Sequence, residues 1–228
     1  YYYDYLHENE VPRIATSLTL DDISYAKYCA HIQYKIPNRI TTMIVEKSKH
    51  YRPRLPGSLK NLIFKTTQHG YDINKLPKNL VSLELGGENK LFIAPKKLER
   101  LTIYGRVPLN ESSIPDTVYK LYLLCSGHYN CSKILPQRVR CLRIQNIRAE
   151  EVPRSVVHLK ITDTLFGNTS RLPDTLEKLK VVNFSGYVYN YHELPNSIRE
   201  LKIFGNYYVI IPSSVVKLKL LGGYNHYT

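Results

Sequence analysis

The stretch LPNSIRELKIF, residues 194–204, decides the fold because the same eleven-residue phrase recurs along the whole chain. Aligned on its proline, it returns as VPRSVVHLKIT (152–162), LPDTLEKLKVV (172–182) and IPSSVVKLKLL (211–221). Seven more copies lie upstream, 17–25 residues apart. The eleven copies are marked by Pro12, Pro37, Pro56, Pro77, Pro95, Pro115, Pro136, Pro153, Pro173, Pro195 and Pro212. A period near twenty residues indicates a repeat architecture.

The pattern inside the phrase predicts a turn followed by a strand. Apolar residues occupy positions −1, +3, +6 and +8 relative to the proline, whereas position +7 is variable. Apolar residues that flank a variable one have the period of two that is typical of a strand with one buried face. We therefore expect a turn around Pro195 and Ser197 and a short strand from about Glu200 to Phe204. An amphipathic helix, which the proline and the mixed charges first suggest, does not fit this alternation.

The repeat length predicts the fold class. A unit of about twenty residues with one short strand cannot bury its own apolar side chains, but stacked units can. We expect a repeat solenoid, a leucine-rich-repeat-like arc of about eleven coils with a concave parallel β-sheet and few helices. Residues 12–221 would form one solenoid, with 1–11 as an N-terminal cap and 222–228 as a C-terminal cap or tail. A short helix is expected within 21–36, beginning at Asp21 or Asp22.

The phrase L-P-x-S-L-x-x-L-x-φ resembles the FNIP repeat, a relative of the leucine-rich repeat found in social amoebae and giant DNA viruses. The resemblance covers residues 11–225. Position +2 is Ser or Thr in six copies, namely Ser58, Thr117, Ser155, Thr175, Ser197 and Ser214. The second half of the family motif, F-G-x-x-F-N, is mostly lost, and its nearest remnant is LLGGYN at 220–225. The resemblance implies an F-box before the repeats, which would make the chain the substrate-recognition part of a ubiquitin-ligase receptor.

Other classes of function have weak sequence support. The chain contains no P-loop, nucleophile elbow, H-E-x-x-H or dinucleotide fingerprint, so we expect no enzyme and no cofactor. Cys125, His128, Cys131 and Cys141 offer zinc-type ligands, but their spacing is not an established zinc motif, and we expect no metal. No signal peptide or apolar run of membrane-spanning length is found. We expect an intracellular protein without a membrane span, in the host cytoplasm or the virion if it is viral.

Charge is the strongest functional signal. The net charge is +13, and at position +7 the last five coils carry a succession of cations. These outward residues are Arg143, Lys160, Lys180, Lys202 and Lys219. The first six coils carry Thr19, Ile44, Ile63, Glu84, Thr102 and Tyr122 at the same position. Lys178, Lys217 and His158 lie beside the cations at +5, and Glu177 and Glu200 partly offset them. Stacked strands would place the five cations in one column at steps of ~4.8 Å.

This column has two interpretations. Duplication of one repeat would explain it, since Lys solubilises a strand and limits aggregation. Alternatively, the column receives an acidic protein segment, a phosphorylated peptide or a nucleic-acid backbone. Only Tyr119 and Tyr122 are clear outward aromatics, which favours a protein partner over nucleic acid. We therefore predict a protein-interaction scaffold that binds through Arg143, Lys160, Lys180, Lys202, Lys219, Lys178, Lys217 and His158. The alternative is a basic structural or packaging component, for instance of a viral particle, that binds nucleic acid or shell proteins through the same column.

Overall fold

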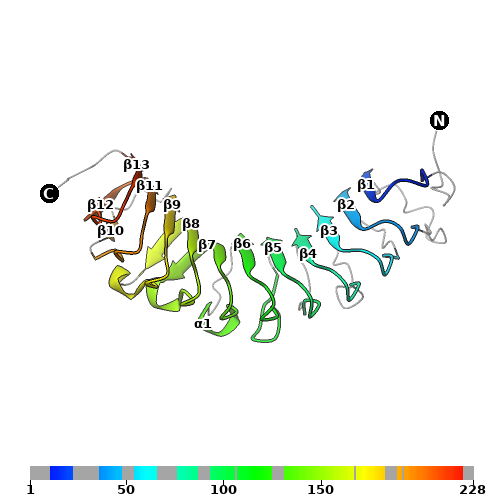
Figure 1. Ribbon diagram of the computed structural model, residues 1–228, viewed down its shortest axis with the longest axis horizontal. Helices are drawn as coiled ribbons and strands as arrows, with labels where there is room; N and C mark the ends of the chain where they lie inside the picture. Colours follow the sequence, from blue (N-terminus) through cyan, green and yellow to red (C-terminus); the bar gives the residue numbers. More distant parts are fainter. Residues whose placement is uncertain are drawn as a thin grey trace. The chain divides into compact units, whose positions relative to one another are not determined.

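The structure is a computed structural model in which the chain divides into two compact units, Tyr1–Thr117 and Val118–Thr228. The residues that it describes are 11–22, 36–47, 54–65, 76–86, 93–105, 107–124, 131–166, 168–182, 189–191 and 193–222. Each unit is built from parallel strands that follow one another in chain order, one strand to each repeat phrase (Figure 1). The predicted fold class, a leucine-rich-repeat-like parallel β-solenoid with few helices, is confirmed.

Unit 1 contains five of these strands. They are β1 (Ser17–Asp22), β2 (Thr42–Lys47), β3 (Asn61–Phe64), β4 (Ser82–Leu85) and β5 (Arg100–Tyr104). Each strand pairs in parallel with the next, and the register matches the repeat phrase position by position. Met43, for example, lies between Leu18 and Leu62.

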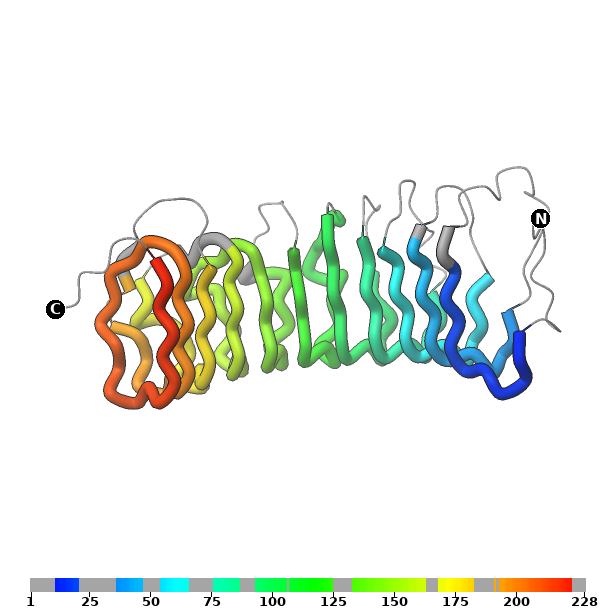
Figure 2. The backbone as a smooth tube through the Cα atoms, turned by 90° about the horizontal axis from the view of Figure 1, so that it is seen from above, coloured from blue at the N-terminus to red at the C-terminus, as the bar shows by residue number. Residues whose placement is uncertain are grey.

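Unit 2 contains six repeat strands, which lie side by side in both backbone views (Figure 1, Figure 2). They are β6 (Lys120–Leu124), β7 (Cys141–Arg148), β8 (His158–Phe166), β9 (Lys178–Val182), β11 (Glu200–Phe204) and β13 (Lys217–Leu221). A second, two-stranded parallel sheet joins β10 (Tyr189–Tyr191) to β12 (Tyr207–Val209). The remaining elements are short: helix α1 (Cys131–Ile134) and the 3-10 helices η4 (Ala149–Glu151) and η5 (Thr169–Arg171).

The core consists of the apolar positions that the repeat phrase predicts. In the coil of Pro195, the side chains of Ile198 at +3, Leu201 at +6 and Ile203 at +8 are at most 1% exposed. Lys202, between the last two, lies outside the core, so β11 alternates as expected for a strand with one buried face. The predicted strand from about Glu200 to Phe204 is confirmed residue for residue. Burial of these apolar ladders is the main favourable contribution to folding.

The proline turn connects each coil to the one before it. In the coil of Pro195, the amide of Ile198 donates to the Pro195 carbonyl at 3.2 Å, which closes a tight turn. The amides of Arg199 and Glu200 then donate to the Glu177 carbonyl of the preceding coil at 2.8 and 3.0 Å. Proline is tolerated at the first residue of this turn because the turn uses its carbonyl as the acceptor and needs no N–H from it.

The predicted domain boundaries are only partly covered by the described residues. Asp21 and Asp22 belong to strand β1 and so are not the start of a helix; the rest of the helix expected within 21–36 lies almost wholly outside the described residues. The same is true of nearly all of the caps expected at 1–11 and 222–228. One undivided solenoid over 12–221 stays a prediction. No helix among the described residues is both long and apolar enough to cross a membrane.

Candidate functional site

The strand register of unit 2 brings the five predicted cations into one column. Arg143 on β7 lies opposite Lys160 on β8, and Lys160 lies opposite Lys180 on β9. Lys180 lies opposite Lys202 on β11, which in turn lies opposite Lys219 on β13. The column follows directly from the repeat because the +7 positions of stacked coils must align. Its role in binding stays a prediction.

A second column runs beside the first at position +5. It contains Cys141, His158, Lys178, Glu200 and Lys217 on the same five strands. The two columns together carry seven lysine or arginine cations and one carboxylate. The formal charge of the two columns at neutral pH is therefore positive.

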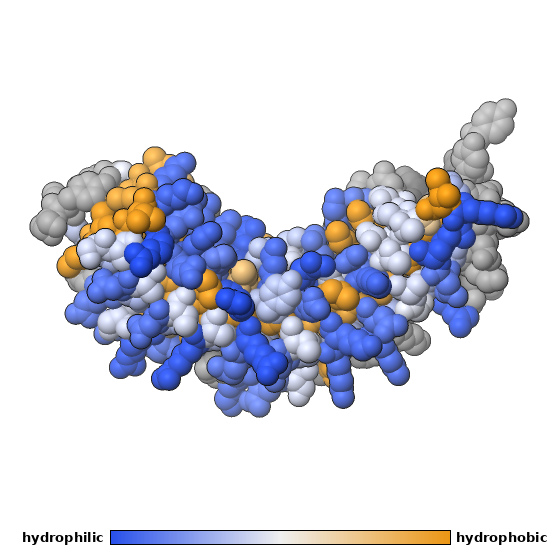
Figure 3. All heavy atoms as spheres, in the orientation of Figure 1, coloured by the Kyte–Doolittle hydropathy of each residue, from blue (hydrophilic) through white to orange (hydrophobic). Residues whose placement is uncertain are grey.

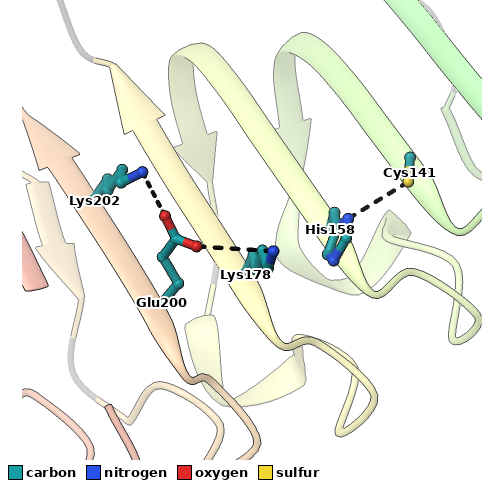
Figure 4. Close-up of polar contacts among 5 residues, drawn as sticks. All are labelled: Cys141, His158, Lys178, Glu200 and Lys202. Carbon is teal, nitrogen blue, oxygen red and sulfur yellow. Dashed lines mark hydrogen bonds and ion pairs between the residues drawn. The ribbon is translucent and has the colours of Figure 1, made fainter. Parts of the chain in front are cut away.

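The two columns contain two polar contacts that join neighbouring strands (Figure 4). Glu200 accepts a hydrogen bond from Lys202 on its own strand and pairs with Lys178 of β9 at 3.9 Å. The Sγ of Cys141 lies 3.6 Å from Nδ1 of His158. The first contact neutralises part of the charge at β9 and β11, whereas the second adds no carboxylate to β7 and β8.

A shallow hollow of about 360 Å³ lies over β6 to β11 on this face. Six of the eight predicted binding residues line it: Arg143, Lys160, Lys178, Lys180, Lys202 and His158. Lys217 and Lys219 belong to β13 and are outside its lining. Tyr122 of β6 lines the hollow beside Arg143, to which it lies opposite in the sheet.

Electrostatic effects differ between the two ends of the hollow. Burial and the positive charges of Arg143 and Lys180 lower the pKa of Lys160 below its ordinary value. The hydrogen bond from Lys202 lowers the pKa of Glu200, with help from the charges of Lys202, Lys217 and Lys178 and against the opposite effect of burial. The β11 end is thus partly compensated, whereas the β7 and β8 end is not.

The ammonium groups of three lysines lie over two aromatic rings. The Nζ atoms of Lys180 and Lys219 lie 5.0 and 5.7 Å from the ring centroid of Phe204, and Lys120 lies 5.2 Å from that of Tyr122. Such cation–π contacts stabilise an ammonium group without neutralising it. Phe204 was not predicted as a site residue, although its place at +9 on β11, next to the column, could have suggested it.

The contact between Cys141 and His158 was not predicted either. Both residues occupy position +5 in consecutive coils, so the register alone would have paired them. Two members of the zinc constellation, Cys125 and His128, lie outside the described residues. Within the described part of the chain, no group of three or more His, Cys, Asp or Glu residues could hold a metal ion.

Unit 1 presents a different strand face. Its +7 column contains Thr19, Ile44, Ile63, Glu84 and Thr102, opposite one another in that order. This column has one carboxylate and no cation. The +7 positions of unit 1 therefore offer nothing that would attract an anion.

Comparison with known proteins supports the fold. Together, the parallel ladders and the twenty-residue coils define a leucine-rich-repeat-like solenoid. The chain is similar to a solved structure, CroV588, described as a novel circular LRR protein structure, with 19% sequence identity and a TM-score of 0.60. The similarity covers 82% of this chain but only 34% of that chain, so the present chain spans about a third of its length. No protein-family model and no curated protein matches the sequence.

Proposed function

We propose that this chain is a non-catalytic interaction scaffold of the FNIP type, which receives an acidic protein segment on the strand face of unit 2. One observation supports this most: five cations occupy aligned positions from Arg143 to Lys219, beside a parallel column with a single carboxylate, Glu200. Like charges at neighbouring positions of a sheet repel one another, so the arrangement costs stability unless an anion lies over it. A partner rich in Asp and Glu would relieve that repulsion.

The dimensions of the column suit an extended peptide. Four steps of about 4.8 Å separate Arg143 from Lys219, so the column spans roughly 19 Å. An extended chain advances ~3.3 Å per residue, and about six residues would follow the column. Because the column crosses the strands, the peptide would lie across the sheet and use its side chains rather than its backbone for recognition. The positive field would also speed the encounter with an acidic partner.

The wider biological role follows from the FNIP resemblance. In an F-box protein of this type, unit 2 would select the target that is delivered for ubiquitination, inside the cell. A basic structural or packaging component of a viral particle would instead use the same column on nucleic acid or on shell proteins. Protein is the favoured partner because Tyr122 is the only aromatic at position +7 in the described strands, whereas single-stranded nucleic acid is bound by several stacking rings.

A charge-reversal experiment tests the proposal. A labelled Asp/Glu-rich peptide of about twelve residues, long enough to cover the column, is titrated into the chain near 0.1 M salt. We expect Lys160→Glu, Lys180→Glu and Lys202→Glu together to weaken binding by roughly 30- to 100-fold, because each exposed ion pair contributes up to ~1 kcal/mol. The matched control reverses three exposed lysines of unit 1, Lys60, Lys78 and Lys96, and should weaken binding only a few-fold.

Two results would contradict the proposal. Equal losses in the column variant and in the control would mean that net charge, not the column, attracts the peptide. Tighter binding of a single-stranded oligonucleotide with the same number of charges would favour the packaging role over the protein scaffold.

A further inference from the structure

The β7 and β8 end of the hollow has cations without a counter-charge. Arg143, Lys160 and Lys180 are consecutive in the +7 column, and none of them forms an ion pair with any carboxylate among the described residues. At the other end, Glu200 already accepts from Lys202 and pairs with Lys178. The β7 and β8 end therefore has no carboxylate that neutralises its cations, whereas the β11 end already contains Glu200.

The groups at this end are partly desolvated before any ligand arrives. The Nε of Arg143 is shielded from solvent and has no hydrogen-bond partner within the described part of the chain. Lys160, its neighbour in the column, is partly buried, and its pKa is lowered by that burial and by the two adjacent cations. Charge-assisted hydrogen bonds are stronger in such surroundings than in bulk water, because the local dielectric constant is lower.

The surroundings of these cations fit a compact anion with several acceptor oxygens. The hollow has a volume of about 360 Å³ and opens on the strand face. Nδ1 of His158 is already close to Cys141 Sγ, so Nε2 is the ring nitrogen left for a ligand. A carboxylate brings one negative charge and two oxygens, whereas a phosphomonoester brings −1.5 to −2 charges and three strong acceptors near neutral pH. The phosphomonoester matches three adjacent cations better than a carboxylate does.

We propose that this end of the hollow binds a phosphomonoester, so that the acidic partner is a phosphorylated protein segment whose phosphate lies over Arg143, Lys160 and Lys180. The inference rests on the proposed function and deepens it. The carboxylates of the partner would follow the rest of the column toward Lys219, and the phosphate would fix the register of the segment on the sheet. Phosphorylation of the partner would then control binding.

The test uses three peptides of the same acidic sequence on the full chain. Their central residue is serine, phosphoserine or glutamate, and binding is measured by fluorescence anisotropy near physiological salt, where distant charges are screened. We expect the phosphoserine peptide to bind at least about ten-fold more tightly than the glutamate peptide, because two to three charge-assisted hydrogen bonds replace one or two. Inorganic phosphate at millimolar concentration should compete with the phosphoserine peptide and not with the serine peptide.

Two variants test whether Arg143 and Lys160 cause the preference for the phosphoserine peptide. Arg143→Gln and Lys160→Met should each reduce the ratio of phosphoserine to glutamate affinity to about two-fold or less. Both peptides should also bind more weakly to these variants than to the wild type. Lys219→Met, in the column but outside the hollow, should weaken both peptides equally and leave the ratio unchanged. Circular dichroism confirms folding, and Lys160→Met serves as the test if Arg143→Gln does not fold.

The outcomes separate this inference from the proposed function. Equal affinity for the phosphoserine and glutamate peptides overturns the phosphate site and leaves the acidic-segment scaffold standing. A phosphoserine preference that survives both variants also overturns the site, because the phosphate then binds elsewhere. Failure of all three peptides to bind overturns both proposals. Competition by inorganic phosphate as strong as that of the phosphoserine peptide itself would indicate a site for free phosphate rather than for a protein segment.

Discussion

In six coils, a hydroxyl at position +2 joins the coil to the preceding one. Ser197 Oγ donates to the Leu176 carbonyl at 2.8 Å, and Ser155 Oγ donates to the Val139 carbonyl at the same distance. All six Ser or Thr residues at this position make the equivalent bond to the +3 carbonyl of the previous coil. The preference for Ser or Thr at this position is visible in the repeat phrase. Its hydrogen bond could not be predicted, because the acceptor lies about twenty residues away along the chain.

Ser197→Ala should destabilise unit 2 by about 1 kcal/mol, because it leaves the Leu176 carbonyl without this donor in a part-buried place. Urea unfolding followed by circular dichroism measures the change in the free energy of unfolding. Ser213→Ala is the matched control, since Ser213 is exposed at position +1 of a neighbouring turn. It should change stability by less than ~0.5 kcal/mol, and a cost equal to that of Ser197→Ala would show that the +2 hydroxyl has no special role.

Protonation of Glu200 should produce a measurable pH dependence of the free energy of unfolding. Its pKa in the folded chain lies below the ordinary value of 4.5, first because of the hydrogen bond from Lys202. A lowered carboxyl pKa means that the unfolded chain binds more protons, so the stabilisation is present above pH 4.5 and is lost as pH falls through the folded-state pKa. Glu200→Gln should therefore be less stable than the wild type at pH 7, and the difference should shrink on acidification toward pH 3.

The control for this prediction is Glu177→Gln in the preceding coil. The Glu177 side chain is exposed and forms no ion pair with the described residues, so its replacement should have little effect at either pH. A Glu200→Gln effect that stays constant between pH 7 and pH 3 would mean that packing, and not the carboxylate charge, accounts for it.

At the level of elements, the repeat strands were predictable and the connecting segments were not. The strands recur with the phrase, and apolar residues occupy +6 and +8 in every copy. The second sheet of β10 and β12 lies in segments of unequal length that share no repeated motif. The extensions of β7 and β8 beyond the phrase pair only after a register shift between Ile144 and Asn146. Such pairing depends on which segments stack, which a local pattern does not encode.

The candidate site was predictable to the same degree. The two columns follow from the strand register, and every lysine and arginine in them was predicted from the repeat phrase. The difference in charge compensation between the β11 end and the β7 and β8 end of the hollow was not predictable. It depends on which way the side chains of Glu200 and Lys178 reach across the sheet, and on the partial burial of Arg143 and Lys160.

The last strand of unit 2 differs from its neighbours in burial, although its sequence is nearly the same. Leu201 on β11 and Leu218 on β13 occupy the same +6 position and lie opposite each other in the sheet. Leu201 is 0% exposed and Leu218 is 48% exposed. Apolar side chains accordingly gather on the surface at the β13 end of unit 2 (Figure 3). Burial at this position comes from the next coil, and no further coil follows β13 among the described residues.

Leu201→Ala should cost about 2–5 kcal/mol of unfolding free energy, because it leaves a cavity in a closed core. Leu218→Ala should cost less than ~1 kcal/mol, since half of that side chain already contacts solvent. Urea unfolding of the two variants measures both values under the same conditions. Equal costs would contradict the difference in burial between Leu201 and Leu218 and would imply that Leu218 is covered in solution.

At the level of the whole molecule, the charge of +13 is unevenly placed. The +7 column of unit 1 contains Ile44, Ile63 and no cation, whereas that of unit 2 contains a cation in five consecutive strands. The lysines of unit 1 that are exposed lie elsewhere, as Lys78 and Lys96 do in the proline turns. Net charge alone would attract an acidic partner to both units, but only unit 2 presents aligned cations on its strands.

Hydrogen-exchange mass spectrometry on the full chain should locate binding in unit 2. With the acidic peptide present, we expect slower amide exchange in β7, β8, β9, β11 and β13 and no change in β1 to β5, because bound peptide restricts opening only where it contacts the sheet. The protection should disappear near 1 M salt, where the screening length falls to about 3 Å. Protection over β2 and β3, or protection that persists at high salt, would place the interaction on the apolar Ile44 and Ile63 stripe and refute a basic binding surface.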